Sequence, residues 1–205
     1  MFIKELVLAS SSPYRRKLLQ STGLTFRCQP ADVDESSIHG RNAHDTAKLR
    51  ARRKAEAVGR LHPQSLVLGC DQVLGFNEQN IPKARTAEVT KEHLRMLSGQ
   101  QHTLYSAFAL YLHHSKPPLL AIDVIPAHMR MRQLTAAEID GFIAFDEWSE
   151  TVGCYRYEST AVNLFEHVDG SQHTIVGLPL LEVLTTLRKI GINPLLAPQP
   201  PWELR

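Results

Sequence analysis

The chain has 205 residues, of which 43% are hydrophobic and 21% charged, and this composition is typical of a globular protein rather than a disordered or fibrous one. The net charge of +2 is too small to indicate a nucleic-acid partner, and three cysteines without a Cys-x-x-Cys pair indicate neither a disulfide framework nor a zinc site. No stretch approaches the roughly 18 apolar residues that cross a bilayer, and the apolar run of MFIKELVLAS is too short for a signal peptide, so we expect a cytoplasmic protein without a membrane partner.

The first half of the chain alternates strands and helices. Ser12 followed by Pro13 is a typical helix start, because serine caps a helix and proline suits its first turn. Residues 42–59 predict a helix with alanines on one side and cations on the other. The predicted order is strand 5–9, a helix from Pro13 to Gly23, strand 25–28, helix 42–59 and strand 65–70 (SLVLGC).

The second half adds two long strands that lie next to each other in sequence. The segment NEQN predicts a turn within residues 76–81, and Thr135 with Glu138 forms a capping box. The expected elements are helix 86–98, paired strands 103–113 and 121–132, a helix after Thr135, a final helix around residues 180–187, and an irregular proline-rich tail from about residue 194. Because the two adjacent strands interrupt the alternation, we expect one α/β domain over residues 1–205 with a mixed sheet.

The stretch LASSSPYRRKLL, residues 8–19, is the first candidate for chemistry. A helix start presents unpaired backbone N–H groups that attract anions, and Ser10, Ser11 and Ser12 add hydroxyl donors. Arg15 lies in the first turn, where a cation is unfavourable because the helix dipole is positive there. An anion bound by both Arg15 and the helix start would explain this placement. The stretch predicts a phosphate site, with a capped surface helix as the alternative.

Acidic and basic residues follow on separate loops and helices. Residues 32–35 (DVDE) hold three carboxylates that could bind a hard cation or form an exposed acidic loop. Arg50, Arg53 and Lys54 share a helix face, which is either solvated or, less favoured, laid on nucleic acid. Asp71 follows a buried strand, where open α/β sheets place ligands. Together these residues are what hydrolysis of a phosphoanhydride needs.

The order of motifs resembles the Maf family of nucleotide pyrophosphatases, also called septum-formation-inhibitor proteins. The motifs are LASSSPYRRKLL, VDE, RKAEAV, GCDQV, IPKART, GCYRYE and HTIVGLPL, in that order from about residue 6 to residue 196. The resemblance implies an ITPase-like α/β fold with an elongated mixed sheet and two lobes around a cleft. It also implies hydrolysis of a nucleoside triphosphate to the monophosphate and pyrophosphate.

The resemblance also implies roles for particular residues. Asp71 matches the family's catalytic aspartate, and Ser10, Arg15, Glu35, Lys54 and Lys83 match its polar cluster. On this basis Asp71 accepts a proton, while Arg15, Lys54 and Lys83 hold the triphosphate. Glu35 and Asp71 would hold a divalent cation (Mg²⁺, Mn²⁺ or Co²⁺), and the partner expected beside the nucleotide is a second copy of the chain.

Three positions resemble the branch of the family that acts on 7-methyl-GTP. They are Tyr14, Gln72 and Glu158, whereas the branch acting on dTTP and UTP carries other residues there. N7-methylguanine is positively charged, and an aromatic face and a carboxylate suit such a base. A dTTP/UTP pyrophosphatase and a non-catalytic nucleotide-binding regulator of cell division are the alternatives.

Overall fold

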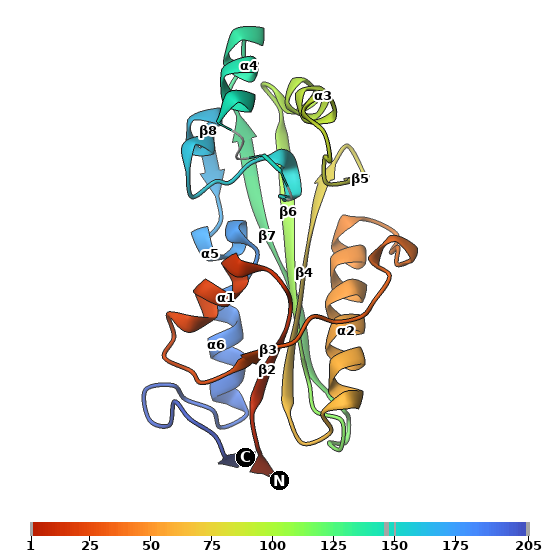
Figure 1. Ribbon diagram of the computed structural model, residues 1–205, viewed down its shortest axis with the longest axis vertical. Helices are drawn as coiled ribbons and strands as arrows, with labels where there is room; N and C mark the ends of the chain where they lie inside the picture. Colours follow the sequence, from red (N-terminus) through yellow and green to blue (C-terminus); the bar gives the residue numbers. More distant parts are fainter. Residues whose placement is uncertain (1, 146–147, 150, 204–205) are drawn as a thin grey trace.

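The computed structural model describes residues 2–145, 148–149 and 151–203, and these form a mixed α/β fold around one long sheet (Figure 1). Its strands are β2 (Leu6–Ala9), β3 (Arg27–Cys28), β4 (Leu66–Phe76), β5 (Gln79–Ile81), β6 (Gln101–Tyr111), β7 (Leu119–Met131) and β8 (Phe165–Asp169). Their order is β3-β2-β4-β6-β7-β8, with β5 also paired to β4. β2 runs parallel to β3 and β4, while the remaining pairs are antiparallel. The predicted elongated mixed sheet is therefore confirmed.

Helices cover both faces of this sheet. They are α1 (Pro13–Gln20), α2 (Ala43–Leu61), α3 (Ala87–Leu97), α4 (Ala136–Ala144), α5 (Gln172–Val176) and α6 (Leu180–Lys189), joined by the 3-10 helices η1 (Glu35–Ser37), η2 (Val152–Cys154) and η3 (Thr160–Leu164). α2 lies along one face, α1, α5 and α6 lie on the other, and α3 and α4 pack together at the far end (Figure 1). None of the helices in the described part of the chain is long and apolar enough to cross a membrane.

The buried apolar side chains gather at two levels of the sheet, which defines two lobes. In the lobe that holds α1, α2 and α6, one cluster packs under α6 and another under α2. A further cluster fills the lobe that holds α3 and α4. The cluster under α6 includes Leu8, Leu68 and Val183, and the cluster under α2 includes Val7, Ala51 and Val67. The cluster in the lobe of α3 and α4 includes Leu74, Leu94 and Phe142. The long strands β4, β6 and β7 run through both lobes.

Several local predictions are confirmed at the level of single residues. Ser12 caps α1 with its side chain, and Pro13 occupies the first turn. Residues 135–138 form the expected capping box. Asn77 and Glu78 have φ angles of 47° and 63°, and this left-handed pair makes the predicted tight turn between β4 and β5.

Strand β4 is longer than the sequence predicts. It does not end at Cys70 but continues to Phe76, because its antiparallel pairing with β6 runs without a break from Val67 to Gly75. Asp71 and Gln72 therefore lie inside a strand, not in the loop after one. Their polarity suggested a strand end, but each finds partners on its own face of the sheet.

The tail is not irregular throughout. Residues 194–201 lack helix and strand, but β9 (Trp202–Glu203) pairs antiparallel with β1 (Phe2–Ile3). The Trp202 ring is 3% exposed, and its Nε1 donates to the Ala197 carbonyl at 2.8 Å. Burial of this large ring fixes the tail against the α6 side of the core.

Small residues let α2 approach β4 closely. Alanines at 43, 47, 51 and 55 form the buried side of the helix, as the sequence predicts. Opposite them, a Cβ built on Gly69 would collide with the Ala51 carbonyl oxygen and lie 2.7 Å from the Ala55 nitrogen. Only glycine leaves room for the helix backbone at this point of the strand.

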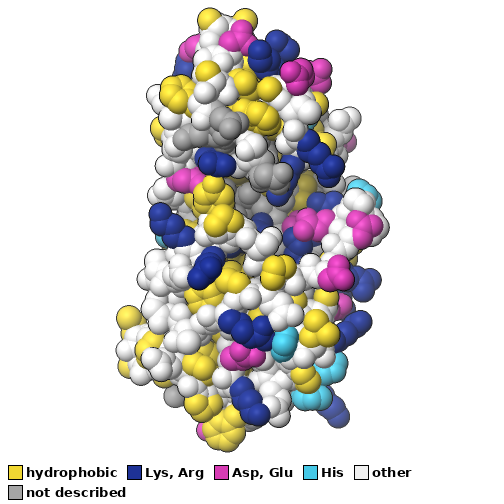
Figure 2. Space-filling view, in the orientation of Figure 1, with side chains coloured by type: hydrophobic (Ala, Val, Ile, Leu, Met, Phe, Trp, Pro, Cys, Tyr) yellow, Lys and Arg dark blue, Asp and Glu magenta, His cyan; other side chains and the backbone are white. Residues whose placement is uncertain are grey.

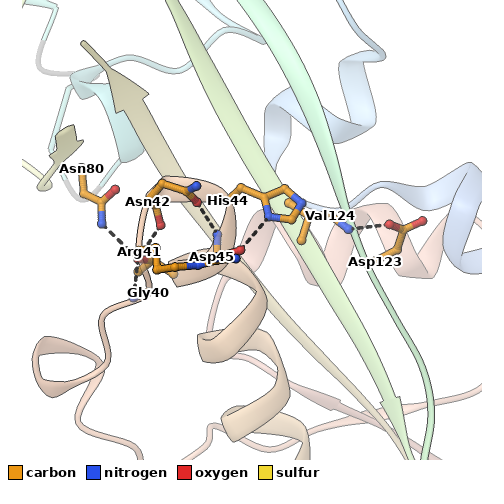
Figure 3. A network of polar contacts seen from close by, with 9 residues as sticks. Gly40, Arg41, Asn42, His44, Asp45, Asn80, Asp123 and Val124 are labelled. Atoms are coloured by element: carbon orange, nitrogen blue, oxygen red, sulfur yellow. Dashed lines mark hydrogen bonds and ion pairs between the residues drawn. The ribbon is translucent and has the colours of Figure 1, made fainter. Parts of the chain in front are cut away.

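Thr46, buried in the first turns of α2, joins three segments. Its hydroxyl donates to the Asn42 carbonyl at 2.8 Å and accepts from the Gly40 amide at 2.9 Å and from Asn80 of β5 at 3.0 Å. Figure 3 shows Asn80 and Gly40 converging on this turn, where Asp45 also pairs with Arg41 and His44. The loop after η1 and the β4–β5 hairpin are thus both held to α2.

The close approach of α2 predicts a large cost for Gly69→Ala. The added methyl must push α2 away from β4, and overpacking of this kind costs about 1–3 kcal/mol of unfolding free energy. Gly141→Ala in α4 is the matched control, because a Cβ there meets nothing within 4 Å. The control should be neutral or gain up to ~1 kcal/mol from helix propensity. Equal unfolding midpoints in urea for both variants would contradict the prediction.

Candidate active site

The candidate site lies at an interruption in the edge of the sheet. β2 pairs with β4 up to Ala9 opposite Gly69, and β5 pairs with β4 only from Leu74 onward. Among the described strands, none pairs with residues 70–73 on that side. Side chains of successive strand residues point to opposite faces, so Asp71 and Gln72 lie on different faces of β4 beside this interruption.

Asp71 points to the α2 face and forms a charged cluster there. Lys54 Nζ lies 2.7 Å from Asp71 Oδ1 and 2.8 Å from Glu35 Oε1. The side chains of Lys54 and Asp71 are 9% and 5% exposed, while that of Glu35 is 49% exposed. Three of the predicted site residues, from strand β4, helix α2 and the 3-10 helix η1, are therefore brought together.

Of the two alternatives for the acidic run at residues 32–35, a three-carboxylate cation site is not formed by the described residues. Asp34 caps η1, accepting from the Ser36 amide at 3.0 Å and from the Ser36 hydroxyl at 2.6 Å. Only Glu35 reaches Lys54. Among the described residues, no group of three or more His, Cys, Asp and Glu side chains is placed to hold a metal ion.

Two features of the cluster suit a cationic ligand or a water molecule. Asp71 Oδ2 is buried and has no hydrogen-bond partner among the described residues. Burial alone would raise the pKa of the Glu35 carboxyl, but the charges of Lys54, Arg50 and Lys83 outweigh burial and hold this pKa below its usual value. Glu35 therefore stays ionised at neutral pH.

Gln72 points to the other face, where a cavity opens beside α1 and α5. Of the predicted site residues, this cavity brings together Tyr14, Arg15, Gln72, Lys83 and Glu158. Lys83 is exposed there, and its charge also acts on Glu35, so it links the cavity to the charged cluster. Ser10, Glu35, Lys54 and Asp71 do not line the cavity.

The serine-rich loop and Arg15 are partly used in holding the fold. The Ser12 amide donates to Ser10 Oγ at 3.1 Å, so one of the N–H groups expected for an anion is satisfied within the loop. Arg15 Nε donates to the Gly177 carbonyl at 2.8 Å, and its Nη1 donates to the Cys70 carbonyl at 3.2 Å. Arg15 thus ties α1 to β4 and to the turn between α5 and α6, and it also lines the cavity.

Sequence reasoning missed Arg156. Its guanidinium carbon lies 5.8 Å from the centre of the Tyr14 ring, over the kind of aromatic face that was assigned to a base. Its Nε is buried and has no hydrogen-bond partner among the described residues. The motif GCYRYE held the signal, because an arginine between two tyrosines stands two residues before Glu158. Ser12, one of the predicted hydroxyl donors, also lines the cavity, and the lining residues that were not predicted are Thr151, Val152, Tyr155, Tyr157, Ile175 and Val176.

Lys54 does not belong to the solvated basic face expected of α2. Its ammonium is turned inward to Asp71 and Glu35, whereas Arg53 is 62% exposed and lies 3.8 Å from Glu56. On the side of the molecule seen in Figure 2, Lys and Arg side chains alternate with Asp and Glu. Of these two neighbouring cations on α2, Lys54 therefore belongs to the charged cluster and Arg53 to the exposed surface.

Comparisons with known proteins place this chain in a family. The model of the Maf-like protein family matches residues 5–190. A 7-methyl-GTP pyrophosphatase from Bartonella quintana is 37% identical over 94% of this chain and 98% of its own length. A nucleoside triphosphate pyrophosphatase from Rhodopseudomonas palustris is 40% identical over 89% of this chain and 92% of its own.

Among solved structures, a HAM1 protein from Coxiella burnetii aligns with 91% of this chain and 99% of its own, at 17% identity and a TM-score of 0.48. The family assignment depends on the sequence matches, which span nearly the whole chain and include every predicted site residue. By these matches, the chain belongs to the Maf family.

Proposed function

We propose that this Maf-type nucleoside triphosphate pyrophosphatase acts on 7-methyl-GTP and depends on a divalent metal cation. The observation that carries the proposal is the pair Asp71–Gln72 at the interrupted edge of the sheet. One residue belongs to a buried charged cluster and the next to a cavity with aromatic and acidic walls. A nucleotide lying across the edge would meet both.

The charged cluster suits the attack of water on the α-phosphorus. Asp71 Oδ1 is held by Lys54, which leaves Oδ2 to accept the proton of the attacking water. Lys83 and Arg15 line the cavity and would neutralise the triphosphate, with pyrophosphate as the leaving group.

Glu35 and Asp71 would suit a divalent cation, since hard cations prefer carboxylate oxygens and both carboxylates already converge on one positive charge, Lys54 Nζ, at 2.8 and 2.7 Å. Two carboxylates are enough for Mg²⁺ when phosphate oxygens and water complete its shell. The cation would supply positive charge at the phosphates, where negative charge develops.

The cavity supports the choice of 7-methyl-GTP. Tyr14 offers an aromatic ring and Glu158 a carboxylate, and both suit a positively charged base. The relatives named 7-methyl-GTP pyrophosphatase match across nearly the whole chain, including Bartonella quintana at 37% identity. A pyrimidine such as that of dTTP or UTP would gain little from either residue.

Asp71→Asn should lower kcat for pyrophosphate release at least a hundredfold, because the amide cannot accept the proton. Circular dichroism should show an unchanged fold, since Lys54 keeps Glu35 as its partner. Asp123→Asn, an exposed aspartate on β7, is the control and should keep full activity. Full activity of Asp71→Asn would remove Asp71 from the reaction.

Chelation by EDTA should abolish turnover, and adding Mg²⁺, Mn²⁺ or Co²⁺ should restore it. In Glu35→Gln, the metal concentration that gives half-maximal rate should rise by roughly tenfold or more, because one anionic ligand is lost. Turnover that persists in EDTA after dialysis would exclude the metal from the proposal.

Glu158→Gln should reduce the preference for 7-methyl-GTP over GTP roughly fivefold. This corresponds to ~1 kcal/mol, the attraction between unit charges about 4 Å apart in water. Glu92→Gln, an equal charge change on exposed α3, is the control. The measurement is kcat/KM for 7-methyl-GTP, GTP, dTTP, UTP and CTP, and an unchanged ratio in Glu158→Gln would contradict the charge argument.

A further inference from the structure

The amide of Gln72 has only one orientation that its surroundings allow. Its Nε2 lies 2.8 Å from Ser106 Oγ, 3.1 Å from the Thr174 carbonyl and 3.0 Å from the Ile175 carbonyl. Ser106 Oγ donates its own proton to the Thr174 carbonyl at 2.7 Å, so it can only accept from Gln72. If the amide were rotated by 180°, Oε1 would face three acceptors.

Ser106 owes its place beside Gln72 to the register of the sheet. The two residues lie directly opposite each other in the β4–β6 pair, and both point to the face that carries α5. Ser106 and Thr174 are completely buried, so their hydrogen bonds are shielded from water. The buried hydroxyl, together with the Thr174 and Ile175 carbonyls, therefore holds the amide in a defined direction.

This arrangement turns Gln72 Oε1 toward the cavity as an acceptor. No described residue donates a hydrogen bond to it. A Cβ on Gly177 would lie 3.5 Å from this oxygen and 3.5 Å from Arg15 Nε, so the glycine leaves the space in front of Oε1 open. Glu158, on another wall of the cavity, is also an acceptor. A base bound here meets acceptors at both positions.

We propose that Ser106 is a positioning residue that fixes Gln72 Oε1 as the acceptor for an N–H donor of a guanine-type base. Guanine presents N1–H and an N2 amino group on its Watson–Crick edge, whereas the ring N1 of adenine is an acceptor and would be repelled. The inference rests on the proposed function. It adds that the cavity presents a hydrogen-bond acceptor to the base and so selects a base that offers an N–H donor.

Ser106→Ala is the decisive variant. Without the hydroxyl, Gln72 Nε2 loses its nearest acceptor and keeps only the Thr174 and Ile175 carbonyls, so the amide is held less firmly and Oε1 is less well directed at a guanine-type base. We expect kcat/KM for 7-methyl-GTP relative to that for ATP to fall about tenfold, the factor that one hydrogen bond of ordinary strength is worth. The change should lie in KM, with kcat for 7-methyl-GTP nearly unchanged, because Asp71 and Lys54 are on the opposite face.

Ser65→Ala is the matched control, since Ser65 is also a buried serine and its hydroxyl donates to Glu5 at 2.8 Å, away from the cavity. Ser106→Thr keeps the hydroxyl and should keep the preference. If Ser106→Ala does not fold, Ser106→Cys takes its place, because a thiol is only a weak acceptor: a lowered preference in the folded variant supports the inference and an unchanged one overturns it. Binding of 7-methyl-GTP and ATP by calorimetry supplies the ratio where turnover is absent.

The outcomes separate the two proposals. If the wild-type chain prefers guanine nucleotides and folded Ser106→Ala keeps this preference, the role of Ser106 is overturned and the proposed function is not. Equal loss of kcat on all nucleotides in Ser106→Ala also overturns it, because it would show a merely structural role. A wild-type chain that prefers pyrimidine nucleotides overturns both the base in the proposed function and this inference.

Discussion

Helix α2 lies so close to strand β4 that Gly69 cannot be replaced by a residue with a side chain without moving one of them. Four alanines on the helix and the glycine on the strand make this contact, and its position determines where Lys54 is placed. The lysine stands one residue before Ala55 and reaches Asp71 at 2.7 Å. A buried ion pair is stable only with good geometry, so the narrow spacing is a condition of the charged cluster.

The second constraint is the interruption in the sheet edge. A continuous edge strand would cover residues 70–73 and hide Asp71 and Gln72 from a ligand. β2 ends at Ala9 and β5 begins its pairing at Leu74, so four residues of a central strand behave locally as an edge. Arg15 satisfies the Cys70 carbonyl there, which protects part of the open edge without closing it.

The sequence predicts the elements well but the contacts between them less well. Caps, turns and the alanine side of α2 depend on neighbours within a few residues, so they were predictable. The inward position of Lys54 was not, because Arg50 and Arg53 have the same character and the deciding partner lies in another element. Gln72 likewise owes its orientation to carbonyl groups 102 and 103 residues away. The family resemblance supplied Asp71 and Lys54, while Arg156 and Ser106 needed the three-dimensional arrangement.

The two levels of apolar core have a consequence for cooperativity. Each level has apolar clusters of its own, so we expect each to behave as a unit in local opening, although β4, β6 and β7 join the two. The cavity takes Tyr14 and Arg15 from one unit and Tyr155 and Glu158 from the other. A molecule bound there touches both, so its binding free energy adds to the free-energy cost of opening either unit. The bound ligand therefore couples the two units, and we expect unfolding of the bound chain to be more cooperative than unfolding of the free chain.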